Sequence, residues 1–144
     1  MIVAGPLQPV MTIAELEAFF AQAFPGREQP TKLLEVDSGR VLIAFDPVAA
    51  NQRPGNLVSG PIQMGLADHA AYAVILAHIG PIAMAVTSNL NYSFLRGVKL
   101  ERFFAEAKLL RLGRRLATVD VLLWQDDRAR PVGQATVTYA IPDS

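Results

Sequence analysis

In the segment 54–72, Gly60 and Asp68 stand at positions where they could take part in chemistry. Gly60 stands before Pro61, which suits the first position of a helix because its missing N–H would be unpaired there anyway. We therefore expect a helix with Gly60 as its N-cap, whose free backbone amides would form a site for an oxyanion. Two turns further on, Asp68 interrupts an apolar run, where a carboxylate is costly unless it is paired, hydrated or functional.

Each of these residues also has a structural explanation. Asp68 could bond a neighbouring loop or strand, and Gly60 could be a helix cap or a close-packing glycine. We expect His69 to be a structural histidine and assign no role to His78. His69 faces about 100° away from Asp68 on the helix, and His78 lies near the helix end, where its charge suits the dipole.

The composition excludes several classes of function. Of 144 residues, 51% are apolar and 18% charged, the net charge is zero, and there is no cysteine. The net charge of zero gives no reason to expect nucleic acid or an anionic membrane as a partner. The two histidines lack metal-ligand spacing. The near-apolar run 70–86 is too short and too interrupted to span a bilayer, and no secretory signal is apparent. We expect a soluble cytoplasmic protein.

Hydrophobic periodicity and turn residues predict the elements of the first half. Thr12 and Glu15 form a capping box that begins a helix. The expected elements are a helix from Thr12 to Phe24, strands at 33–37 and 40–46, a loop at 47–55, and the central helix to about Ile79.

Four strands follow, each predicted by alternating apolar and polar side chains. In the first, Val86, Leu90, Tyr92 and Phe94 alternate with polar residues. The others are expected at 103–109, 117–123 and 134–139. The spacing indicates a largely antiparallel meander with one packed face. One sheet wrapped around one central helix, an α+β architecture, satisfies the pattern. We expect a single domain over 1–144, with a lead-in and helix at 1–30 and the core at 31–144.

Four short segments, taken in their order and spacing, resemble a known family. They are Ser59-Gly60-Pro61, Leu66-Ala67-Asp68-His69-Ala70, the segment 86–96, and Leu112-Gly113-Arg114. Between 54 and 141 the chain resembles the hotdog-fold acyl-CoA thioesterases of the phenylacetate-pathway type. The resemblance implies the hotdog fold, an antiparallel sheet wrapped around one long central helix. It also implies hydrolysis of an acyl-CoA thioester to the free acid and coenzyme A, without a metal or redox cofactor.

The resemblance implies roles for particular residues. Asp68 matches the acidic residue that activates water or attacks the thioester, and Gly60 matches the glycine whose amide holds the thioester oxygen. Thr87 matches a hydroxyl that positions the water. Simple alternation places Thr87 on the polar side of its strand, so this role needs a bulge or a location between subunits. The chain departs from the family at Ser59, where histidine is usual, and at Pro61, where a second glycine is usual. Ser59 can donate a hydrogen bond but cannot carry a proton as histidine does.

The segment 96–115 is locally basic, with seven basic and two acidic residues and hence a net charge of +5. Coenzyme A brings several phosphate charges, and arginine suits phosphate. We expect Arg96, Gly113, Arg114 and Arg115 to bind the coenzyme A part of the substrate. The alternative is a solvated strand face.

Thioester hydrolysis also constrains the assembly, because it needs a donor at the developing oxyanion and a base or nucleophile on the other side of the carbonyl. Gly60 and Asp68 are eight residues apart, about 12 Å along a helix at about 1.5 Å per residue. Both must lie within about 3 Å of reacting atoms, which one chain cannot easily achieve. Two antiparallel central helices can pair Gly60 of one subunit with Asp68 of the other. We therefore expect a homodimer or homotetramer.

Several alternatives stay open. A non-catalytic hotdog protein that binds acyl-CoA or lipid would fit if Asp68 were bonded away from the cleft. A hotdog hydratase or dehydratase would need a histidine across from the carboxylate, and neither His69 nor His78 is placed for that. The sequence does not distinguish a base from a nucleophile, or coenzyme A from an acyl-carrier protein. Nor does it choose between Asn51 and Asn56 as the asparagine that tends to precede this loop in the family.

Overall fold

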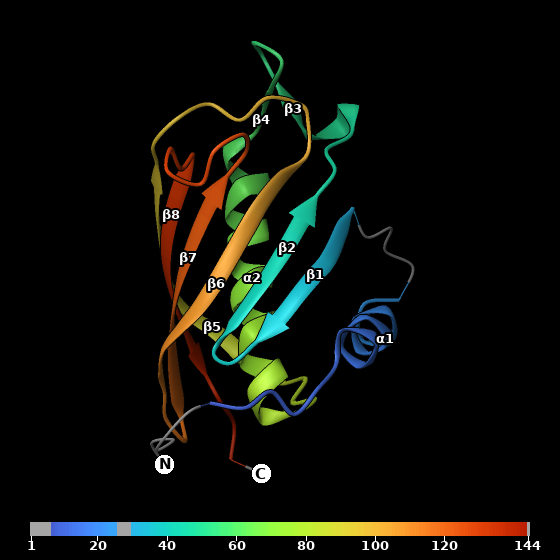
Figure 1. Cartoon of the computed structure of the whole chain (residues 1–144), viewed down its shortest axis with the longest axis vertical. Coiled ribbons are helices and arrows are strands. Elements are labelled where there is room, and N and C mark those ends of the chain that lie inside the picture. Colours follow the sequence, from blue (N-terminus) through green and yellow to red (C-terminus); the bar gives the residue numbers. More distant parts are fainter. Residues whose placement is uncertain (1–6, 26–29, 144) are drawn as a thin grey trace.

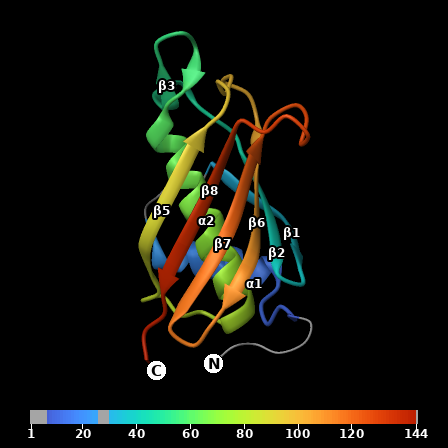
Figure 2. The same cartoon turned by 90° about the vertical axis from the view of Figure 1, so that its left-hand side faces the viewer.

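The computed structural model describes residues 7–25 and 30–143 (Figure 1). Its main components are a long helix, α2, and a six-stranded sheet that curves around it (Figure 2). A shorter helix, α1, lies beside β1 at one edge of the sheet. In chain order the elements are α1 (Ile13–Ala23), β1 (Thr31–Asp37), β2 (Arg40–Phe45), the 3-10 turn η1 (Ala49–Asn51), β3 (Gln52–Arg53), β4 (Leu57–Val58), α2 (Gly60–Ile79), β5 (Val86–Phe94), β6 (Phe103–Leu112), β7 (Leu116–Trp124) and β8 (Gly133–Ala140).

The strands of the large sheet are all antiparallel and follow the order β1-β2-β6-β7-β8-β5. The predicted hotdog fold, an antiparallel sheet wrapped around one long helix, is therefore confirmed. Strands β6, β7 and β8 form the expected meander, but β5 pairs with β8 at the far edge and not with β6 (Figure 2). Chain order does not reveal this arrangement. Because α2 lies between β2 and β5 in the chain, β5 need not pair with β2, and β6 pairs with β2 in its place.

Helix α2 begins one residue earlier than predicted: Ser59 is its N-cap, and Gly60 is its first helical residue. Buried residues run without a break from Ala70 to His78, so this half of the helix is enclosed on every side. The helix ends at Gly80, whose φ of +97° is a conformation that glycine adopts without strain. No helix in the described ranges is long and apolar enough to cross a membrane.

Helix α1 covers the β1 edge of the sheet. The predicted capping box is present: Thr12 Oγ1 accepts from the N–H of Glu15 at 3.1 Å, and Glu15 Oε1 accepts from the N–H of Thr12 at 2.9 Å. Phe20 is buried against the core, and Glu17 Oε1 accepts from the N–H of Leu33 in β1 at 3.0 Å. At the opposite edge, none of the described residues pairs with the outer side of β5.

A β-bulge in β5 reverses which of its alternating side chains face α2. The register against β8 shifts between Thr87 and Asn89, so Ser88 is the extra residue. Thr87, paired with Tyr139, therefore faces α2. The expectation that Val86 lies on the packed face is wrong, because the bulge turns Val86 to the other face of the sheet, where it is 52% exposed.

A second, small sheet forms where the sequence predicted only a loop. Strands β3 and β4, of two residues each, pair as an antiparallel hairpin directly after η1. Between them Gly55 and Asn56 have φ values of +96° and +57°, which turn the chain tightly. The hairpin ends at Val58 and so fixes the direction in which the chain enters Ser59 and α2.

Candidate active site

Asp68 lies half-buried on α2, and its carboxylate has two hydroxyl neighbours. Thr87 Oγ1 donates to Asp68 Oδ1 at 2.6 Å, and the Tyr139 hydroxyl donates to the same oxygen at 2.8 Å. The Tyr139 hydroxyl also lies 3.2 Å from the backbone carbonyl oxygen of Asp68. Within the described part of the chain, no group donates to Oδ2. One carboxylate oxygen is thus held, and the other is available to a water or a substrate.

Thr87 and Tyr139 reach Asp68 together because they are opposite each other in β5 and β8. The bulge at Ser88 turns Thr87 toward α2 and so meets the first of the two alternative conditions for its implied role. Tyr139 belongs to the packed face of its strand, and its position in the sequence alone points to no role in the site. A buried tyrosine nevertheless usually has a partner for its hydroxyl, and that is the signal that points to it.

The ring of Tyr139 is held by a second tyrosine. Tyr139 stacks on Tyr72 with ring centroids 5.8 Å apart, and the Tyr72 hydroxyl donates to the carbonyl oxygen of Ala83 at 3.1 Å. Burial raises the pKa of Tyr139 well above its usual range. The Tyr139 hydroxyl therefore keeps its proton and donates it to the carboxylate.

Neither histidine faces the carboxylate. The ring of His69 packs on Phe20 of α1 with centroids 4.7 Å apart. Burial lowers the pKa of His69 to about 4, against the opposing effect of the neighbouring Asp68 charge. His78 Nε2 accepts from the N–H of Gly39 at 2.9 Å, so its ring attaches the β1–β2 turn to α2.

Gly60, the first residue of α2, presents a backbone N–H that no described residue accepts. A Cβ here would lie 3.2 Å from the ring of Phe94, so glycine lets the ring lie close to the backbone. Gly60 and Phe94 border a cavity of about 410 Å³, which Gln63, Arg53 and Arg96 also line. Arg96 Nη1 donates to a backbone carbonyl in the β7–β8 loop at 2.6 Å.

Ser59 and the two candidate asparagines lie on the approach to Gly60. The Ser59 hydroxyl makes no capping hydrogen bond, and its N–H donates to the carbonyl oxygen of Asn51 at 2.9 Å. Asn51 Oδ1 accepts from the N–H of Val48 at 2.8 Å. Asn51 thus contacts the loop directly, whereas Asn56 belongs to the β3–β4 turn.

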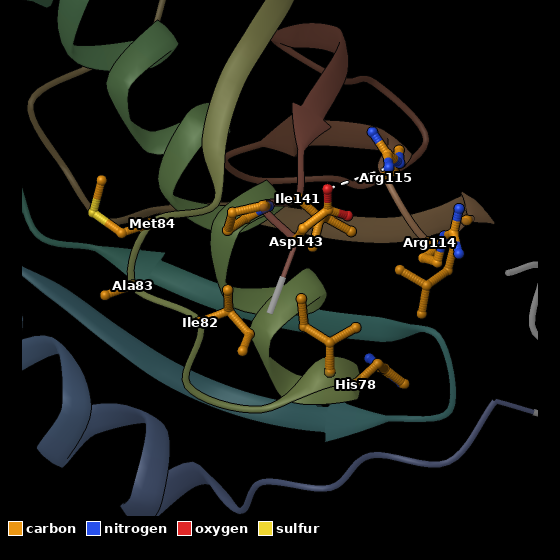
Figure 3. A pocket seen from close by; sticks show the side chains of 12 residues that line it. His78, Ile82, Ala83, Met84, Arg114, Arg115, Ile141 and Asp143 are labelled. Atoms are coloured by element: carbon orange, nitrogen blue, oxygen red, sulfur yellow. Dashed lines mark ion pairs between the residues drawn. The ribbon is translucent and has the colours of Figure 1, made fainter.

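A larger cavity of about 1120 Å³ lies at the C-terminal end of α2 (Figure 3). Gly113, Arg114 and Arg115 line it together with an apolar wall, in which Ile82 and Met84 lie across from the two arginines. Arg115 Nη2 is paired with Asp143 at 3.2 Å.

The structure therefore brings the predicted site residues together in three groups. Thr87 lies against Asp68, Ser59 and Gly60 form the start of α2 beside Arg96, and Gly113, Arg114 and Arg115 share the large cavity. Gly60 and Asp68 stay eight residues apart on one helix, as expected. Among the described residues, no cluster of three or more histidine or acidic side chains could hold a metal ion.

A long helix inside a curved antiparallel sheet, with a hydrogen-bonded carboxylate on the helix, defines a hotdog-fold protein with a candidate hydrolytic site. Residues 55–132 match the thioesterase superfamily, and the chain belongs to that superfamily. No curated protein matches the chain.

Solved structures share the fold over most of the chain. A candidate thioesterase from Silicibacter sp. TM1040 is 34% identical, with 95% of this chain and 96% of that chain covered and a TM-score of 0.86. A candidate thioesterase from Ralstonia eutropha, named as related to phenylacetic acid degradation, is 25% identical, with 85% and 98% covered and a TM-score of 0.73. A hypothetical thioesterase from Streptococcus pneumoniae, solved with coenzyme A, is 19% identical, with 79% and 90% covered and a TM-score of 0.69.

Proposed function

We propose that this protein hydrolyses an acyl-CoA thioester to the free acid and coenzyme A, with Asp68 as base or nucleophile. The observation that carries the proposal is the Asp68 carboxylate, held by two hydroxyls at Oδ1 while Oδ2 stays available. Membership of the thioesterase superfamily supports the class of reaction. The Streptococcus pneumoniae structure with coenzyme A supports the kind of substrate.

Oδ2 of Asp68 can act in either of two ways. As a base, it takes a proton from a water whose oxygen attacks the thioester carbonyl carbon; the oxyanion then collapses, the carbon–sulfur bond breaks, and the leaving thiolate is protonated. As a nucleophile, it attacks the carbon itself, the thiolate leaves, and water hydrolyses the resulting anhydride. The proton of Thr87 is already donated to Oδ1. The Thr87 hydroxyl can therefore position a water only as an acceptor.

The oxyanion donor in this proposal is the N–H of Gly60 from a second copy of the chain. Two features of the described structure support a second copy at this face. The nine residues of β5 form a sheet edge with an unpaired outer side, which can pair with another chain. On α2, Met64 and Gly65 are exposed between Gly60 and Asp68, although most of the helix is buried.

The large cavity at the end of α2 is the proposed place of the coenzyme A nucleotide. From Asp68 to His78, which lines this cavity, the helix rises about 15 Å, a separation that suits the extended pantetheine arm. The apolar wall suits the adenine ring, and Arg114 and Arg115 suit the phosphates. Arg96 lies at the other end of α2 and comes near the same substrate only if a second, antiparallel helix supplies it.

The alternative functions have less support. A hydratase would need a histidine facing Asp68, but His69 packs on α1 and His78 bonds the β1–β2 turn. A non-catalytic binding protein would be favoured by an Asp68 carboxylate bonded away from the cleft, but both hydroxyl donors bind Oδ1, and Oδ2 has no donor among the described residues.

The test is a mixed dimer of two inactive variants. Asp68→Asn cannot take a proton, and Gly60→Pro has no amide donor. Ser59 has φ −67° and ψ 153°, a conformation that a following proline tolerates. The new proline would itself stand before Pro61 at a helical position, which is unfavourable for a residue with a Cβ, so both parents must melt close to the wild-type temperature before the dimers are compared. If each site combines Gly60 of one subunit with Asp68 of the other, the mixed dimer holds one intact and one doubly altered site.

The two variants are co-expressed with different affinity tags, and the dimer that carries both tags is isolated. It should hydrolyse the best acyl-CoA of a panel at about half the wild-type rate per dimer, while each parent stays about 10²-fold or more slower than the wild type. Gly60→Ala adds a Cβ beside Phe94 but keeps the N–H, so it controls for crowding. A stable but inactive mixed dimer would contradict the shared site. A wild-type protein that hydrolyses no acyl-CoA would contradict the function.

A further inference from the structure

We propose that Tyr139 is a positioning residue for Asp68: its hydroxyl holds Oδ1 and so directs Oδ2 to the open side of α2. The inference rests on the proposed function, in which Oδ2 meets the water or the thioester. Tyr139 itself contacts neither of them and acts through Asp68.

The Tyr139 hydroxyl is close to two oxygens of the same residue. It lies 2.8 Å from Asp68 Oδ1 and 3.2 Å from the backbone carbonyl oxygen of Asp68. The single hydroxyl proton goes to the carboxylate, which is the closer and the charged acceptor. A carboxylate oxygen that must stay beside one fixed hydroxyl limits the side-chain rotamers of Asp68. The direction of Oδ2 is thereby limited as well.

Of the two hydroxyls on Oδ1, that of Tyr139 is held more firmly. Tyr139 is 3% exposed, and its strand pairs on both sides, with Ala117 in β7 and Thr87 in β5. Its ring is also stacked on Tyr72. Thr87, in contrast, is exposed and lies next to a bulge in an edge strand. The carboxylate is therefore oriented from the buried side by Tyr139, and Thr87 adds a second donor at the open side.

The role of the Tyr139 hydroxyl can be tested without changing the packing of the ring. Phenylalanine keeps the ring, the stack on Tyr72 and the strand pairing, and removes only the donor to Asp68. Oδ1 keeps Thr87 as a donor, so the carboxylate is not left without a partner. A structural role alone predicts a small loss of stability with unchanged chemistry. A positioning role predicts nearly unchanged stability with a slower chemical step.

Loss of the Tyr139 hydroxyl should also shift the pH dependence of the hydrolysis rate in a defined direction. A hydrogen bond to a carboxylate favours its charged form, so without it the acidic limb of the pH–rate profile should move to higher pH. Thr87 on β5 and Tyr139 on β8 bond the Asp68 carboxylate, and the neighbouring His69 on α2 feels its charge. Nearby in the chain or on the helix that packs against α2, Tyr72 bonds Ala83, and α1 carries Glu15 and Glu17. The pKa of His69 is about 4, and burial raises the pKa of Tyr72. The two glutamates bond backbone amides of Thr12 and Leu33.

The experiment compares Tyr139→Phe with Tyr72→Phe, which removes a hydroxyl from the same aromatic stack without removing a donor to Asp68. Both variants should melt close to the wild-type temperature. Tyr139→Phe should lower kcat for the best acyl-CoA by about 10- to 100-fold with little change in KM, and its acidic limb should move to higher pH. Tyr72→Phe should leave that limb in place. A crystal structure of Tyr139→Phe should show the Asp68 side chain in a changed or divided orientation.

An unchanged kcat with an unmoved acidic limb in Tyr139→Phe would overturn the inference. Equal losses in Tyr72→Phe would also overturn it, as would a crystal structure of Tyr139→Phe in which the carboxylate keeps its wild-type position. The crystal structure separates this inference from the proposed function. If the wild type hydrolyses no acyl-CoA, the proposed function fails, and the carboxylate position in the variant still decides whether Tyr139 sets it.

Discussion

Asp68 is the residue on which the proposed chemistry depends most directly. Asparagine keeps its volume and can still accept from Thr87 and Tyr139, but it takes no proton and does not attack. We expect Asp68→Asn to fold and assemble normally and to lose a factor of about 10² or more in kcat. Its melting temperature should be unchanged or slightly higher, because a costly charge is gone. Thermal melting and steady-state hydrolysis measure the two effects; a much lower melting temperature would show that Asp68 is structural.

His69, next along the helix, gives a pH dependence of stability. Its pKa is about 4 in the folded protein against an ordinary value of 6.5, so below pH 6.5 the unfolded chain binds a proton that the folded chain does not. Stability should therefore fall as pH is lowered from 6.5 toward 4, by up to about 1.4 kcal/mol per pH unit. The free energy of unfolding is compared between wild type and His69→Gln across this range. Parallel curves for the two proteins would contradict the prediction.

At this scale the sequence was informative where a residue stands out locally. A carboxylate in an apolar run and a glycine before a helical proline are visible without a structure, so the sequence alone makes Asp68 and Gly60 candidates. Thr87 and Tyr139 meet Asp68 only through the register of β5 against β8. The bulge that sets this register has no local signal, and it reverses the face of Val86, which alternation placed inward.

Among the elements, β2, β6 and the β7–β8 loop meet at one buried charge. Glu106 in β6 is 5% exposed and accepts from Arg40 Nε at 2.6 Å and from Arg128 Nη2 at 2.5 Å. Burial works to raise the pKa of Glu106, but the hydrogen bonds from Arg128 and Arg40 outweigh it, and the pKa lies below its ordinary value of 4.5. The pair of arginines therefore stabilises the charged form.

Glu106→Gln should lower the free energy of unfolding by about 1–3 kcal/mol at neutral pH, because Arg128 loses its charged acceptor and Arg40 keeps only the more exposed Glu35 and Asp37. The folded-state pKa is the lower one, so the contribution of the charge is present above pH 4.5 and is lost as pH falls through the folded value. Denaturant titrations should show the variant approach the wild type on acidification. Asp46→Asn, which breaks the exposed pair with Arg102, is the control and should cost far less. An equal cost would contradict a special role for burial.

Long elements could be predicted from the sequence, and short or distant pairings could not. The helices and the six long strands each carry several periods of apolar residues, so their type and approximate ends follow from the pattern. Strands β3 and β4 are two residues each and have no period. They form because Gly55 and Asn56 turn the chain between them. The place of β5 beside β8 depends on contacts far apart in the chain, which no local pattern contains.

For the whole molecule, Gly65 tests whether two central helices meet. A Cβ at Gly65 would contact nothing within 4 Å in the described chain, so a single subunit tolerates a larger side chain there. Gly65→Ala should stabilise the helix by about 1 kcal/mol and keep the assembly. Gly65→Trp should keep the helix apart from a second copy and give folded, inactive monomers. Light scattering and hydrolysis measure both; an active Gly65→Trp dimer would show that the helices meet elsewhere.

The two arginines of the large cavity differ in their freedom to bind phosphate. Arg115 is paired with Asp143, whereas Arg114 makes no ion pair within the described residues (Figure 3). A contact that is equally strong in the ground state and the transition state changes KM and leaves kcat alone. Arg114→Ala should therefore raise KM for the acyl-CoA several-fold, and Arg115→Ala less. Added salt should reduce the difference from wild type.

Arg111→Ala is the matched control for this prediction. Arg111 is an exposed arginine of the same basic segment, but it lies outside the cavity. A specific phosphate site predicts that only Arg114→Ala raises KM, whereas a general attraction to the basic face predicts equal effects from both variants. The same acyl group on a pantetheine thioester, which lacks the nucleotide phosphates, should show no effect of Arg114→Ala. An unchanged KM for acyl-CoA in Arg114→Ala would mean that the nucleotide binds elsewhere and that this arginine is only part of a solvated strand face.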